Sequence, residues 1–281
     1  MRVAVTTFLL AMAVGIPAWG ATEDESRWHD LRESLFGDRQ IHEESGVVSL
    51  EAPYRAHDAA LVPITFEAAF PQTNERYVKT ITLIVDENPL PMAGQFHFTD
   101  ASGWAAISTR IRVNAYTHVR AVAETNDGEL HMAKRYVKAS GGCSAPAGKD
   151  PEAALASLGK MKLRRSDPVL WGEPNSAQLL VSHPNHTGMQ MDQVTRHYVL
   201  AYFVDSIEVR YGDLPVLAVE SNFSLSENPA VRFHYVPDGP GELSVRVTDS
   251  DGAMFARAWS VPASVATAPV GEEAAPVNPV Q

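Results

Sequence analysis

Short apolar runs separated by turn residues make up most of the chain from about residue 47 onward. In several runs apolar and polar residues alternate, as Leu243, Val245 and Val247 do with their polar neighbours. A period of two is typical of a β-strand with one face buried. The pattern predicts two series of strands, over 62–70, 80–85, 95–98, 107–113, 119–123 and 130–137, and then over 179–182, 200–211, 216–220, 231–236, 243–247 and 255–261.

Two turn sequences support this interpretation. Asn126-Asp127-Gly128 in the first series and Asp249 to Gly252 in the second place a glycine after an acidic residue, which favours a tight hairpin. Two blocks of roughly a hundred residues with this rhythm are typical of immunoglobulin-like sandwiches. The predicted fold class is all-β, with two immunoglobulin-like β-sandwich domains over 26–143 and 176–262.

One segment has a helical period instead. Ser26 to Phe36 predicts a short N-terminal helix that Ser26 caps and Gly37 ends. Its apolar residues fall on one side at helical spacing: Trp28, Leu31, Leu35 and Phe36.

The ends of the chain and the region between the domains follow other patterns. Arg2, the apolar stretch 3–16, and small residues at positions 18 and 20 have the layout of a signal peptide over 1–20, which predicts export to the periplasm. Residues 144–175 predict a linker, with a helix start at Asp150-Pro151 and an alternating run at 160–165 that fits a strand of either domain. The patternless tail, 263–281, predicts disorder.

Net charge and cysteine content exclude several classes of partner and of functional site. Thirty-four acidic residues against 23 lysines and arginines give a formal charge of −11, which argues against nucleic acid and anionic membranes as partners. No second stretch approaches the length of a membrane span. A single cysteine excludes an internal disulfide and cysteine-rich metal sites.

That cysteine, Cys143, lies in a segment of small residues. Gly141, Gly142 and Ser144 around it predict a flexible arm without the scaffold that a nucleophilic enzyme needs. A thiol on such an arm suits thiol exchange inside the active site of another protein. Two alternatives stay open: an inert thiol in a plain binding or adhesion module, and a disulfide-linked dimer or thiol oxidoreductase, although no C-x-x-C pair is present.

Two sequence families resemble the two halves. Residues 28–41 (WHDLRESLFGDRQI), the strands that follow and the Gly-Gly-Cys end resemble SoxY, the sulfur-carrying subunit of the periplasmic Sox sulfur-oxidation system. Residues 180–192 (LVSHPNHTGMQMD), 202–209 (YFVDSIEV), 226–229 (SENP) and 241–249 (GELSVRVTD) resemble its partner SoxZ. The chain resembles a SoxY–SoxZ fusion and is similar to the SoxYZ-like carriers that accompany quinoprotein dehydrogenases.

The resemblance implies a covalent carrier, not an enzyme. Substrate sulfur would be attached to Cys143, with no other cofactor, and would be presented to Sox-type enzymes or to a quinoprotein dehydrogenase system. The SoxZ-like domain would pack against the SoxY-like domain. This chain departs from SoxY, whose cysteine lies near a free C-terminus between glycine pairs, because Ser144-Ala145 and more than a hundred further residues follow Cys143. The arm is therefore expected to work as a loop, unless proteolysis frees it.

Other polar clusters are interpreted as structural. His183 and His186, with His197 nearby, have a spacing that suits one metal ion poorly on extended chain, and His183-Pro184 is expected to form an interface turn. The basic run 160–165 is expected to be a solvated strand face, with attraction of anionic cargo or a lowered thiol pKa as the weaker hypothesis.

Overall fold

The computed structural model describes residues 25–146, 151–193 and 195–262. The predicted signal peptide and the predicted disordered tail lie outside these residues. Within them no helix is both long and apolar enough to cross a membrane.

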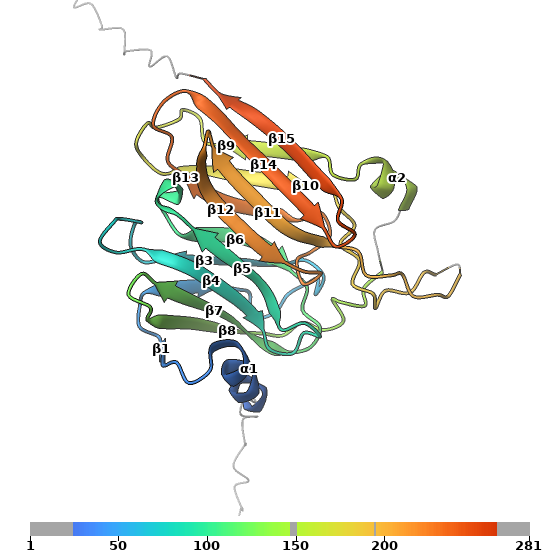
Figure 1. Ribbon diagram of the computed structural model, residues 1–281. Coiled ribbons are helices and arrows are strands. Elements are labelled where there is room, and N and C mark those ends of the chain that lie inside the picture. Colours follow the sequence, from blue (N-terminus) through green and yellow to red (C-terminus); the bar gives the residue numbers. More distant parts are fainter. Residues whose placement is uncertain (1–24, 147–150, 194, 263–281) are drawn as a thin grey trace, which may run out of the picture.

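Helix α1 (Ser26–Phe36) has the predicted bounds and ends at Gly37, whose φ is +61°. The cap differs from the prediction, because the residue before the helix is Glu25 and no side chain caps it. The apolar side of the helix packs on the outside of the first half, where Trp28 is buried in a cluster with Ile84, Val122, Leu130 and Met132. Figure 1 shows the helix at the end of the molecule, beside β7 and β8.

Nine strands form one sheet, in the order β1-β8-β7-β4-β5-β12-β11-β14-β15. The first-half strands are β1 (Ile41–Glu43), β4 (Val78–Val85), β5 (Met92–Phe98), β7 (Thr117–Thr125) and β8 (Leu130–Val137). The second-half strands are β11 (Val204–Tyr211), β12 (Leu214–Ser221), β14 (Gly241–Asp249) and β15 (Met254–Val261). The β7–β8 and β14–β15 connections are the two predicted hairpins, with Gly128 and Gly252 at positive φ.

Six strands form the second sheet, in the order β2-β3-β6-β13-β10-β9. They are β2 (Val48–Glu51), β3 (Val62–Ala68), β6 (Ala106–Ile111), β13 (Ala230–Tyr235), β10 (Asn175–Val181) and β9 (Met161–Arg165). A short 3-10 helix, η1 (Asp100–Ser102), precedes β6.

Both sheets run without a break from one half of the chain to the other. Antiparallel pairing of β5 with β12 joins the halves in the larger sheet, and β6 with β13 joins them in the smaller one (Figure 1). Buried residues of both halves form one core cluster, in which Phe66 and Phe96 from the first half and Phe233 from the second are almost completely inaccessible to solvent. The all-β class with two sandwich halves is confirmed, and the pairing of β5 with β12 and of β6 with β13 makes their sheets continuous.

The region between the halves contains more structure than a linker. Helix α2 (Pro151–Ala156) lies in it, and β9 pairs antiparallel with β10 from Ala177 to Val181. The alternating run is thus a strand of the second half.

Candidate functional site

Cys143 is buried, with none of its surface exposed to solvent. The prediction of an outward-facing thiol on a flexible arm is therefore wrong for this conformation. After β8 the chain turns so that Gly142 and Cys143 are buried, while Gly141 and Ser144 on either side of them stay exposed. The physical reason is that this segment, although built of small residues, finds hydrogen-bond partners in both halves of the chain.

The two glycines allow the segment to lie close to the first half. Gly141 has a φ of +80°, which favours glycine, and its N–H donates to the carbonyl oxygen of Asn114 at 2.9 Å. The N–H of Gly142 donates to Val113 O at 2.9 Å. A Cβ atom at Gly142 would come within 2.0 Å of Ala59 O, so no other residue fits there without a shift.

The second half holds the same segment from the other side. The hydroxyl of Thr187 donates to Cys143 O at 2.6 Å, and the side-chain amide of Gln190 donates to Ala145 O at 3.0 Å. Thr187 and Gln190 are both buried. We call residues 141–146 the thiol segment and residues 183–190 the covering loop. Because these bonds cross between the halves, the thiol lies at the boundary between the two halves of the chain. We call this boundary the seam.

The His183-Pro184-Asn185-His186 sequence forms the start of the covering loop. Asn185 is fully buried at a φ of +45°; its side chain accepts from Val204 N at 2.9 Å and donates to Leu225 O at 3.2 Å. The loop lies at the interface between the halves, because Arg112 donates to Asn185 O.

The histidines of this loop have separate partners. His183 Nε2 lies 3.7 Å from Asp249 Oδ2, and burial lowers the pKa of His183. His186 Nδ1 lies 3.1 Å from Gln190 Oε1. Over the described parts of the chain, no three histidine, cysteine or acidic residues are grouped to hold a metal ion.

Arg112 is the cation beside the thiol segment. It is only 2% exposed, and its guanidinium donates to Gly142 O and to Asn185 O, both at 3.3 Å. Its Nε is buried and has no hydrogen-bond partner. Asp58 and Glu227, which line a pocket with Arg112, act on its charge without forming an ion pair with it. A buried positive charge without a directly bonded anion is costly.

Burial controls the acidity of the thiol. It raises the pKa of Cys143 to about 11, while the positive charge of Arg112 acts in the opposite direction. At neutral pH only about one molecule in ten thousand would then carry a thiolate, against a few per cent for a free cysteine. In this conformation Cys143 is a poor nucleophile and is also inaccessible.

A pocket of about 460 Å³ opens next to the thiol segment. Arg110 and Arg112 of the β6 region contribute to its wall, together with Ala145 and Pro146 of the thiol segment and side chains on both sides of the seam: Asp58, Ala60, Leu61, Glu227 and Asn228. Cys143 itself does not line the pocket.

Sequence reasoning missed the residues that enclose the thiol. Thr187 and Gln190 lie inside the stretch 180–192 that carried the SoxZ resemblance, so a signal for them was present. No sequence pattern marked Arg112 as a site residue, because it is one of several arginines that alternate with apolar residues in this strand region. The basic run at 160–165 lies on β9, and the cation that acts on the thiol is Arg112 instead.

The fold and the site define a double β-sandwich chain with one thiol enclosed at the seam between its halves. Comparison with protein families gives two matches in tandem: the sulfur oxidation protein SoxY over residues 32–143, and the sulphur oxidation protein SoxZ over residues 163–260. The two matches lie in tandem on one chain, which supports a fused SoxYZ-like carrier. The SoxY match ends on Cys143.

Solved structures give further similarities. The sulfur carrier protein SoxY from Chlorobium limicola f thiosulfatophilum is 25% identical, with 41% of this chain and 92% of that chain covered and a TM-score of 0.34. A superoxide reductase (neelaredoxin) from Ignicoccus hospitalis is 14% identical, with coverages of 35% and 94% and a TM-score of 0.32. Fibronectin(III)-like modules of Clostridium thermocellum CbhA are 11% identical, with coverages of 76% and 92% and a TM-score of 0.22. The comparison with curated proteins found no match.

Proposed function

We propose that this chain is a periplasmic covalent carrier that holds sulfur-containing intermediates on Cys143 and presents them to partner enzymes. SoxY and SoxZ domains in one chain point to a sulfur-oxidation carrier. The observation that carries the proposal is that the SoxY match ends on the only cysteine of the chain. The partners would be Sox-type enzymes or a quinoprotein dehydrogenase system, and the carrier itself would not be an enzyme.

The proposed chemistry is thiol exchange at Cys143. A donor with an S–S bond, R–S–S–R′, is attacked by the Cys143 thiolate, so that Cys143–S–S–R forms and R′–S⁻ leaves. The proton of the thiol passes to solvent or to the leaving thiolate, and no external oxidant is needed. Attack by another thiolate on the adduct reverses the step and releases the cargo.

This chemistry requires the thiol segment to open. Its opening breaks the bonds from Thr187 and Gln190 to Cys143 O and Ala145 O, and those from Arg112 and the Gly141 and Gly142 N–H groups. Each bond contributes roughly 1 kcal/mol, so the closed state is favoured by a few kcal/mol over a locally open one. The carrier is then protected when closed and reactive when open.

Arg112 would stabilise an anionic adduct in the closed state. An adduct Cys143–S–S–R whose R group ends in a sulfonate has a negative charge, and Arg112 has a buried Nε without a hydrogen-bond partner. A charge-assisted bond to such a group is about twice as strong as a neutral one.

The burial of Cys143 also favours a second candidate function. In an immunoglobulin-like binding module with an inert thiol, a fully enclosed cysteine would be a packing residue. The two candidates differ in one respect: a carrier must open its thiol segment without global unfolding, and a packing residue need not.

Intact mass of the exported protein tests the proposal. We expect adducts on protein purified without reductant from cells that metabolise the sulfur substrate, and their loss with dithiothreitol and in Cys143→Ser. A homogeneous unmodified mass would support the inert module, and a doubled mass would support a disulfide dimer. The same spectra report the N-terminal residue, which export with cleavage of 1–20 predicts to be Ala21.

The second measurement is the rate at which an alkylating reagent labels Cys143 in the native chain. If the thiol segment opens locally, Cys143 is labelled at a rate higher than that of global unfolding. This rate does not change when a mutation slightly alters the global stability. Labelling only at the rate of global unfolding would contradict the carrier proposal.

A further inference from the structure

The outer face of the six-stranded sheet carries a groove of about 410 Å³ that crosses the seam between the halves. Three arginines from three different strands line it: Arg110 on β6, Arg232 on β13 and Arg164 on β9. We call this the arginine groove. No acidic or aromatic residue lines it.

Sheet register places the arginines beside one another. Ser108 is paired with Arg232, Arg232 with Gln178, and Gln178 with Arg164, so these four residues form one row across β6, β13, β10 and β9. Neighbouring strands lie about 4.8 Å apart, which separates the backbones of Arg232 and Arg164 by about 10 Å. Arg110 lies two residues from Ser108 on the same face.

The three guanidinium groups have no compensating partner. Among the described residues, the structure gives none of these side chains an ion pair or a hydrogen bond to another protein group. Like charges gathered on one face repel one another and reduce stability, and a nearby anionic surface would relieve that cost. The cluster is unusual on a chain with a formal charge of −11.

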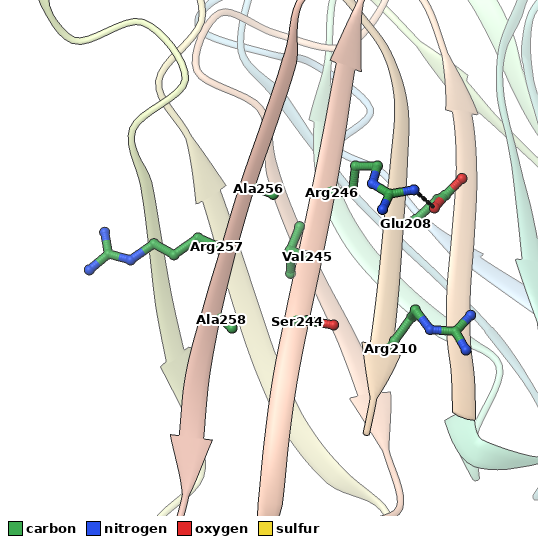
Figure 2. A pocket seen from close by; sticks show the side chains of 8 residues that line it. All are labelled: Glu208, Arg210, Ser244, Val245, Arg246, Ala256, Arg257 and Ala258. Carbon is green, nitrogen blue, oxygen red and sulfur yellow. Dashed lines mark ion pairs between the residues drawn. The ribbon is translucent and has the colours of Figure 1, made fainter. Parts of the chain in front are cut away.

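The corresponding face of the other sheet is different. Its groove also contains three arginines, Arg210, Arg246 and Arg257, but these have partners within the chain. Figure 2 shows Arg246 directed toward Glu208, at 3.7 Å. Arg257 donates to Met161 O at 2.7 Å, and Arg210 donates to Asp213 O.

We infer that the arginine groove is a docking surface for an acidic face of a partner protein. Three cations from three different strands match a protein surface with several carboxylates, because each guanidinium can pair with a carboxylate of its own. The absence of aromatic residues from the groove lining removes the stacking that binding to single-stranded nucleic acid uses.

The groove would also orient the partner. Glu51 and Glu67 lie on β2 and β3 of the same sheet, toward its opposite edge, so charge changes sign across the face. Arg110 lines both the arginine groove and the pocket beside the thiol segment. A partner docked here would therefore lie next to the thiol segment, although the docking itself does not depend on the proposed thiol chemistry.

The test measures binding of a fluorescent peptide of alternating glutamate and valine to the full chain by anisotropy. The groove variant R110Q/R164Q/R232Q is compared with R210Q/R246Q/R257Q, which removes the same charge from three exposed arginines of the larger sheet. At about 20 mM salt we expect the groove variant to bind at least about tenfold more weakly than wild type, and the matched control within about twofold. About 200 mM salt should weaken the wild type toward the groove variant.

Several outcomes would overturn the inference: an equal loss in both triple variants, tighter binding of single-stranded DNA or anionic phospholipid vesicles than of the peptide, or self-association that only the groove variant abolishes. The last result would assign the groove to a second copy of this chain. If the triple variant does not fold, R164E/R232E replaces it, since both side chains are exposed. Cys143→Ser should bind the peptide like wild type, which separates this test from that of the carrier function.

Discussion

Thr187 donates a hydrogen bond from its buried hydroxyl to the carbonyl oxygen of Cys143, over 2.6 Å. The bond joins the covering loop, which lies inside the SoxZ match, to the last residue of the SoxY match. In the fused chain the second domain therefore does more than pack against the first. It encloses the backbone of the residue that we propose to carry the cargo.

Thr187→Val should open the thiol segment more often. Valine keeps the shape but removes the hydroxyl, which leaves Cys143 O without its partner and also loses the bond that Thr187 accepts from Met189 N. A lost buried bond costs about 1–2 kcal/mol, so we expect the native alkylation rate of Cys143 to rise about fivefold to thirtyfold. The measurement is pseudo-first-order labelling without denaturant.

Thr73→Val is the matched control for this variant. Thr73 also donates to a backbone carbonyl and accepts from a backbone N–H, both of Arg76, but it is exposed and lies outside the thiol segment and the covering loop. Its alkylation rate should equal that of wild type. Equal rates for Thr187→Val and wild type would show that the covering loop does not control access.

Gly142→Ala should also increase the rate at which Cys143 is alkylated, in this case by disturbing the contact of the thiol segment with the first half. The added methyl group would lie 2.0 Å from Ala59 O and 2.7 Å from Val113 O, which are backbone atoms that cannot rotate away. Overpacking costs typically about 1–3 kcal/mol. We expect faster labelling of Cys143 and a lower midpoint of urea unfolding.

Gly239→Ala provides the comparison, because no heavy atom lies within 4 Å of a Cβ built there. It should leave both the labelling rate and the unfolding midpoint near those of wild type. If Gly142→Ala behaved in the same way, the close packing of the thiol segment would not be a property of the protein in solution.

Much of the fold follows from the sequence because strand alternation and turn chemistry are local. β8 and α1 have the predicted bounds, and both predicted hairpins are present. The short strands β1 and β2 were missed, because three or four residues do not establish a period. The merging of the sheets was also missed, since edge pairing between β5 and β12 depends on residues more than a hundred positions apart.

The site was less predictable for a related reason. The small residues around Cys143 are consistent with a mobile arm, and they are equally consistent with close packing at a seam. Which of the two occurs depends on Ala59, Thr187 and Gln190, which are distant in sequence. Local composition identified the cysteine but could not determine its surroundings.

Asp86→Asn should strongly destabilise the first half. Asp86 accepts three hydrogen bonds from Arg120, between 2.8 and 3.0 Å, and both side chains are almost fully buried. The guanidinium also stacks over Trp28 of α1, with 4.3 Å from its central carbon to the ring centroid. After loss of the Asp86 charge, the described acidic residue nearest to the Arg120 guanidinium is Glu25, whose carboxylate lies 3.8 Å away. We expect a loss of about 3–5 kcal/mol in the free energy of unfolding, measured with urea.

Glu87→Gln is the control for that experiment. Glu87 pairs with Arg27 at 3.2 Å, but both side chains are more than one-third exposed. Such pairs contribute about 0–1 kcal/mol, so the variant should unfold near the wild-type midpoint. A loss as large as that of Asp86→Asn would mean that burial does not determine the strength of these pairs.

The buried thiol should make the stability of the chain depend on alkaline pH. Burial raises the pKa of Cys143 to about 11, above the value of about 8.5 for a free thiol, so between these values the folded chain holds a proton that the unfolded chain has lost. This contribution is fully present below about pH 8.5 and is lost as pH rises through 11, with an upper limit of about 3 kcal/mol.

Cys143→Ala isolates this effect, because the other groups that titrate in this range are common to both proteins and cancel in the difference. We expect the free energy of unfolding of wild type, relative to Cys143→Ala, to be constant from pH 7 to about 8 and to fall by a few kcal/mol toward pH 11. A difference that stays constant across this range would mean that the thiol titrates normally in the folded chain. Cys143 would then be accessible to solvent, and the closed state described by the structure would not be the dominant one.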